Sequence, residues 1–203
     1  KTMGNNQSWS TVTGNLYKGV MIQTWCNIAA AVFAIIALIT TISDLLNGNF
    51  FSAIEWGFWD YMKIIAVLGG LYGFYLFFIN LRPWKELVDP NDTSSIESIY
   101  TATILQIIGA ILGFIPFIGL IGAIFQIVAW FLLLSAYSKL KNSITFPEAA
   151  KEGAAKIHKA MLINLIAAIL GIIPVINIIA LGLSIYALYL TLKGWKEVAD
   201  AEV

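Results

Sequence analysis

The chain of 203 residues is poor in the side chains that most catalytic and metal sites require. It has one cysteine, Cys26, and one histidine, His158. A single cysteine excludes an internal disulfide and a cysteine-bound zinc or iron–sulfur cluster. A single histidine excludes a metal site built from several imidazoles. We therefore expect neither a metal nor a cofactor.

Charge is also scarce and balanced. Only 12% of the residues are charged, and twelve Lys and Arg face twelve Asp and Glu, which leaves no net charge. Soluble domains carry about 25% charged residues. The lack of a basic excess removes the electrostatic basis for binding nucleic acid. With 59% hydrophobic residues and a mean hydropathy of +0.81, the composition predicts an all-α integral membrane protein.

Long apolar runs are what the sequence has in abundance. Four stretches without charge cover residues 19–43, 64–81, 98–138 and 160–192. One helical crossing needs about 20 residues, so the first two stretches hold one span each and the last two hold two each. Pro116 and Pro174 interrupt the long stretches near their middles, which disfavours one long tilted helix through each. The predicted spans are 20–43, 61–82, 98–115, 118–139, 157–173 and 176–193.

Two connecting segments have structure of their own. Thr145 followed by Glu148 predicts a helix start near residue 147 that runs into the fifth span. Within this lead-in, Glu152 and Lys156 have the spacing of an ion pair on one helix face. The aromatic-rich segment 44–62 is either a short amphipathic helix in the headgroup layer or an early start of the second span.

The basic residues orient the chain. With six spans, eleven of the twelve Lys and Arg lie on one side, and only Lys63 lies on the other. Cytoplasmic loops carry the excess of basic residues. Both termini are therefore expected in the cytoplasm, and a bacterial cytoplasmic (inner) membrane is the expected location.

The sequence repeats itself three times. Residues 164–174 resemble 106–116 and 27–37, and Trp195-Lys196-Glu197 repeats Trp84-Lys85-Glu86. We expect three tandem two-helix hairpins. The resulting division is a polar N-terminal segment (1–19), a first hairpin with an enlarged outer loop (20–89), a second hairpin (98–142) and a third with the helical lead-in (146–200).

Each repeat carries an amide and two small residues in register. The amides are Asn27, Gln106 and Asn164, and the small pairs that follow are Ala30/Ala34, Gly109/Gly113 and Ala167/Gly171. Small residues four apart let helices pack closely in lipid, and the spacing puts each amide on the same helix face. The amides either form hydrogen bonds between helices or line a polar site around a pseudo-threefold axis, with Gln126 or Asn80 contributing.

The two Trp-Lys-Glu segments lie at predicted membrane boundaries. Trp84, Lys85, Trp195 and Lys196 are therefore interpreted as interfacial anchors. A second interpretation is a docking or anionic-lipid surface on the cytoplasmic side.

No residue pattern of a known catalytic site is present, and no motif is specific enough to indicate a family. A non-enzymatic scaffold, accessory or lipid-organising membrane subunit is the function that we predict. Its expected partners are the lipid bilayer and another membrane protein or a second copy of the chain. The alternative is a passive channel or carrier for a small solute, with its site at the pseudo-threefold interface.

Overall fold

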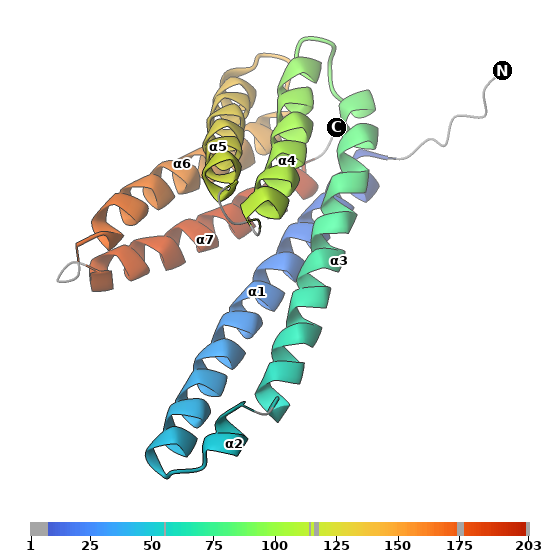
Figure 1. Cartoon of the computed structure of the whole chain (residues 1–203). Coiled ribbons are helices and arrows are strands. Elements are labelled where there is room, and N and C mark those ends of the chain that lie inside the picture. Colours follow the sequence, from blue (N-terminus) through green and yellow to red (C-terminus); the bar gives the residue numbers. More distant parts are fainter. Residues whose placement is uncertain (1–7, 55, 114, 116–117, 174–176, 202–203) are drawn as a thin grey trace. The chain divides into compact units, whose positions relative to one another are not determined.

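The computed structural model describes residues 8–54, 56–113, 115, 118–173 and 177–201 (Figure 1). All regular structure in these residues is helical. The helices are α1 (Trp9–Leu46), α2 (Phe50–Ile54), α3 (Phe58–Leu87), α4 (Thr93–Gly113), α5 (Gly119–Asn142), α6 (Glu148–Gly171) and α7 (Asn177–Ala199). Six of them, all except α2, are long and apolar enough to cross a membrane, as the hydrophobic runs predicted.

The predicted helix breaks are confirmed. α4 ends at Gly113 and α5 begins at Gly119, while α6 ends at Gly171 and α7 begins at Asn177. Pro116 and Pro174, which motivated the breaks, lie outside the described residues. Between α1 and α3 both interpretations of the loop hold in part, because α2 is a separate short helix and α3 begins at Phe58, earlier than expected.

The first helix is longer than predicted. It begins at Trp9 rather than near residue 20, so most of the segment expected to be a polar N-terminus belongs to α1. Trp9, Val12 and Leu16 share one face by their spacing, and all three side chains are buried. At 1.5 Å per residue, the 38 residues of α1 span about 57 Å. That length exceeds the roughly 30 Å of a hydrocarbon core, so the helix can extend beyond the bilayer by several turns.

The lead-in to the fifth span has the predicted helix and the predicted start but a different N-cap. α6 begins at Glu148, and Lys156 pairs with Glu152 at 3.9 Å. Thr145 does not cap the helix, because its hydroxyl donates a hydrogen bond of 2.8 Å to Asp92 Oδ2, and Pro147 is the N-cap residue. The buried carboxylate before α4 thus takes the hydroxyl that the sequence pattern assigned to α6.

The chain forms two compact units, one of residues 18–77 and one of residues 1–17 together with 78–203. In the second unit α4 packs along α5, α6 packs along α7, and α5 contacts α6. The two long pairs can be followed in Figure 1, each as a hairpin of neighbouring helices.

Glycines let the helices of each pair touch through their backbones. A Cβ atom added to Gly73 of α3 would lie 2.7 Å from the carbonyl oxygen of Gly19 of α1. Such an atom on Gly122 of α5 or Gly194 of α7 would lie 2.6 Å from the oxygen of its partner glycine. These distances leave no room for a side chain. We call these three contacts the glycine crossings: Gly19/Gly73, Gly109/Gly122 and Gly153/Gly194.

Candidate functional site

Five aromatic side chains from distant parts of the sequence meet in the second unit. We call them the aromatic cluster: Trp9, Trp84, Tyr137, Phe146 and Trp195. The ring centroids are 6.4 Å apart for Trp9 and Trp84 and 5.6 Å apart for Trp84 and Trp195. Phe146 lies 5.8 Å from Trp9, and Tyr137 lies 6.2 Å from Trp195. All five side chains are buried.

Each member of the aromatic cluster comes from the end of a helix or from a connection. Trp9 is the first residue of α1, Trp84 lies near the end of α3, and Trp195 lies near the end of α7. The indole Nε1 of Trp9 donates a hydrogen bond of 3.0 Å to the carbonyl oxygen of Val198. The cluster therefore joins the start of α1 to the ends of α3, α5 and α7 and to the residue pair before α6.

The structure places two of the predicted interfacial anchors inside the protein. Trp84 and Trp195 are only 1% and 3% exposed, and their indoles pack against each other and against neighbouring rings. Edge-to-face aromatic pairs contribute about 0.5–1.5 kcal/mol each beyond the area that they bury. The lysines next to them do lie outward: Lys85 is partly exposed and Lys196 is exposed.

Polar contacts also join distant segments of the same unit. Lys156 of α6 forms an ion pair with Glu197 of α7, and the Asp92–Thr145 hydrogen bond connects the loops before α4 and α6. Asn15 Nδ2 donates to Asn80 Oδ1 at 3.4 Å, which links α1 to α3. The sequence pattern did not predict these pairs, because their members are tens of residues apart along the chain.

The contacts that the structure describes do not bring Asn27, Gln106 and Asn164 together at one site. Gln126 Nε2 of α5 donates a hydrogen bond of 2.8 Å to the backbone oxygen of Gln106 of α4. Asn27 belongs to the other unit, where its Oδ1 faces Gly70. Asn164 is exposed on α6 and has no hydrogen-bond partner among the described side chains. Gln106 and Gln126 are thus the only two of the predicted polar residues that the described contacts bring together.

The predicted small-residue faces take part in packing to different degrees. Gly109 forms a glycine crossing, and the backbone of Gly113 also lies against Gly122. Ala167 is buried, and a Cβ atom at Gly171 would lie 3.8 Å from that of Ala180. In the other unit the closest approach involves other small residues, since Ala34 is exposed and Ala30 is only partly buried.

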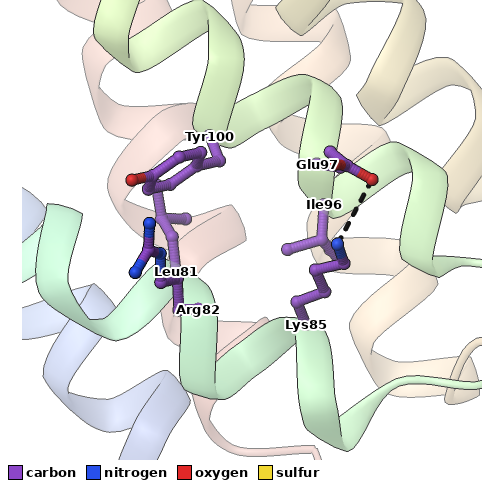
Figure 2. A pocket seen from close by; sticks show the side chains of 6 residues that line it. All are labelled: Leu81, Arg82, Lys85, Ile96, Glu97 and Tyr100. Atoms are coloured by element: carbon purple, nitrogen blue, oxygen red, sulfur yellow. Dashed lines mark hydrogen bonds and ion pairs between the residues drawn. The ribbon is translucent and has the colours of Figure 1, made fainter.

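A groove opens beside the aromatic cluster, between the end of α3 and the start of α4 (Figure 2). It has a volume of about 200 Å³ and is lined by Leu81, Arg82 and Lys85 of α3 and by Ile96, Glu97 and Tyr100 of α4. The Arg82 guanidinium lies 5.3 Å from the centroid of the Tyr100 ring. Lys85 Nζ lies 3.2 Å from Glu97 Oε2. Leu81 and Ile96 also line the groove, and both side chains are buried.

The groove is lined by two cationic side chains and one carboxylate. Its two cations come from α3, and cation–π contact and one ion pair hold them in place. Among the residues that the structure describes, no three His, Cys, Asp or Glu side chains come close enough together to hold a metal ion.

Comparison with known proteins gives no relative: no protein-family model, no curated protein and no solved structure matches the chain. Function is therefore inferred from the aromatic cluster, the glycine crossings and the groove.

Proposed function

We propose that the protein is a non-enzymatic scaffold or accessory subunit of a membrane, which fixes its own helix ends and offers its apolar helix faces to lipid and to other membrane chains. The observation that carries this proposal is the aromatic cluster. Its five buried rings join five separate segments of the chain, so the ends of the helices are held by contacts that require no ligand.

The proposed topology has six crossings arranged as three hairpins, with both termini in the cytoplasm of a bacterial cell. The distribution of Lys and Arg supports this orientation. The aromatic cluster supports it as well, because Trp9, Trp84, Phe146 and Trp195 come from segments that this topology assigns to one side. The sequence repeat supports the threefold organisation, and in each of the three hairpins a glycine crossing holds the two helices together.

The faces that the chain leaves open support a scaffolding role. Large apolar side chains such as Ile35, Leu38 and Ile39 of α1 are exposed, which suits contact with acyl chains or with other helices. Asn164 is an exposed amide in the apolar part of α6. A hydrogen bond to a neighbouring helix stabilises such a side chain in lipid by about 0.6–2 kcal/mol. A partner protein or a second copy would supply that bond.

A passive channel or carrier is the second candidate. It needs water to reach the amides of all three hairpins at their common interface. The hydrogen bond from Gln126 to Gln106 favours the scaffold, because it uses the polar side chain of α5 to hold two helices together. The exposed Asn164 is the feature that favours a channel.

Cysteine accessibility in intact membranes distinguishes the two functions. Cys26 is replaced by Ala, and single cysteines are placed at Asn27, Gln106 and Asn164 for labelling by a small water-soluble thiol reagent. We expect no labelling at these three positions and strong labelling of a control cysteine at Ser52, which is exposed on α2. Labelling at all three would contradict the scaffold and require transport assays.

A further inference from the structure

We infer that the groove between α3 and α4 binds the phosphate of an anionic phospholipid. This deepens the proposed function by naming the lipid that the scaffold would organise. It depends on that proposal only for the orientation, which puts the groove in the cytoplasmic leaflet.

The first argument is charge. Arg82 and Lys85 lie one helical turn apart on α3 and both line the groove. Lys85 is paired with Glu97, whereas Arg82 forms no ion pair within the described part of the chain and rests on the Tyr100 ring. One positive charge is therefore left over, and a guanidinium matches the oxygens of a phosphate.

The second argument is depth. Arg82 is the first charged residue after the charge-free stretch 64–81, and Glu97 is the last one before the stretch 98–138. The groove therefore lies where both apolar runs end, which is the level of the lipid headgroups. A ligand with a charged head and apolar chains fits this position better than a soluble anion does.

The third argument is the apolar surface that continues from the groove. Phe78 stacks on Tyr100 with ring centroids 5.0 Å apart, and Phe78 lies one turn from Arg82 toward the apolar middle of α3. Leu81 and Ile96 are buried apolar side chains that also line the groove (Figure 2). A phosphate held by the two cations would thus leave its acyl chains next to stacked aromatic rings.

The repeated sequence provides a matched control. Lys193 and Lys196 of α7 correspond to Arg82 and Lys85 in the repeat. Lys193 also lies near a tyrosine ring, that of Tyr189, at 5.9 Å. Both lysines are exposed and neither lines the groove. The two pairs therefore carry the same charge at equivalent helix ends, but only Arg82 and Lys85 line this groove.

The test measures binding of dioleoyl phosphatidylglycerol to the full chain in detergent by native mass spectrometry, with dioleoyl phosphatidylcholine as the zwitterionic comparison. The double variant Arg82→Gln/Lys85→Gln should bind phosphatidylglycerol roughly 10- to 30-fold more weakly, since each basic residue near a membrane surface contributes about 1 kcal/mol. Lys193→Gln/Lys196→Gln should bind like the parent chain.

A third variant guards against loss of binding through misfolding. Glu97→Gln removes the carboxylate that competes for Lys85, so binding of phosphatidylglycerol should become about fivefold tighter. Equal losses in both double variants, equal binding of phosphatidylcholine or unchanged binding by Glu97→Gln would overturn the site. Displacement of the lipid by millimolar glycerol 3-phosphate would overturn the lipid as its ligand. None of these outcomes depends on thiol labelling at Asn27, Gln106 and Asn164. The lipid-site proposal and the scaffold proposal can therefore be contradicted independently of each other.

Discussion

The same three residues, Trp-Lys-Glu, lie near the ends of α3 and α7, but a different charged residue forms the ion pair in each copy. In the first copy Lys85 is paired with Glu97 and Glu86 is exposed. In the second copy Glu197 is paired with Lys156 and Lys196 is exposed. Only the tryptophans do the same thing, since both are buried and in contact with each other. The charged neighbours bind whatever partner the adjacent helix supplies, whereas the indole position is fixed by packing.

The largest loss of stability should come from substitution of Trp84 or Trp195. Trp84→Ala and Trp195→Ala should each lower the free energy of unfolding by about 3–5 kcal/mol, because each leaves a large cavity among buried rings. Unfolding by sodium dodecyl sulfate in mixed micelles measures this. Trp25→Ala is the control, since Trp25 is 60% exposed. A loss at Trp84 no larger than at Trp25 would contradict the aromatic cluster.

The next largest loss of stability should come from Gly194, the residue before Trp195. Gly194 is a member of a glycine crossing, whereas the first copy has Pro83 at the equivalent position. Gly194→Ala should lower the free energy of unfolding by about 1–3 kcal/mol, because the methyl group would overlap the backbone of Gly153. Gly182→Ala on the same helix meets nothing within 4 Å. It should be neutral or slightly stabilising in the same unfolding assay, and equal losses at the two glycines would rule out the crossing.

Substitutions of Glu197 and Glu86 should differ by a smaller amount in their effect on the free energy of unfolding. Glu197→Gln should cost about 1–2 kcal/mol, because it removes the charge from a partly buried ion pair with Lys156. Glu86→Gln should change the free energy of unfolding by less than about 0.5 kcal/mol, as expected for an exposed side chain. The difference between these two variants, measured side by side, tests whether the second copy depends on its acid.

The Lys85–Glu97 pair should matter least to stability. Its side chains are 38% and 61% exposed, and such pairs contribute about 0.2–1 kcal/mol. We expect Lys85→Gln to fall in that range at low salt and to have no effect at 1 M salt, where screening is nearly complete. A larger or salt-independent loss would mean that the lysine is part of the packed end of α3 rather than of an open groove.

Most of the fold follows from local sequence. The runs of uncharged residues predicted six long helices, and Pro116 and Pro174 predicted where the long runs divide, because both signals act within a few residues. The start of α1 was missed, since residues 9–18 are too polar to resemble a membrane span. The signal that could have shown this start is the helical spacing of three apolar residues, Trp9, Val12 and Leu16, all of which are buried.

The candidate site was harder to predict. The recurrence of Trp-Lys-Glu drew attention to Trp84 and Trp195, but the common location of tryptophan at membrane surfaces suggested contact with lipid. Their mutual contact joins helices more than a hundred residues apart, and nothing in either local sequence encodes the partner. Gln106 and Gln126 were both singled out by the sequence, which left open whether they join helices or line a polar site, and the bond between the Gln126 side chain and the backbone oxygen of Gln106 was not predicted.

The indole of Trp9 and the carbonyl of Val198 are separated by 189 positions in the chain. At about 5–20 residues per second of protein synthesis, roughly 10–40 s pass between the incorporation of Trp9 and that of Val198. During that interval the first helices are already made while the aromatic cluster lacks Trp195. The Trp9 indole therefore has no access to this acceptor until the end of α7 has been synthesised, so the contact can form only after the segments from α1 to α7 have all been made.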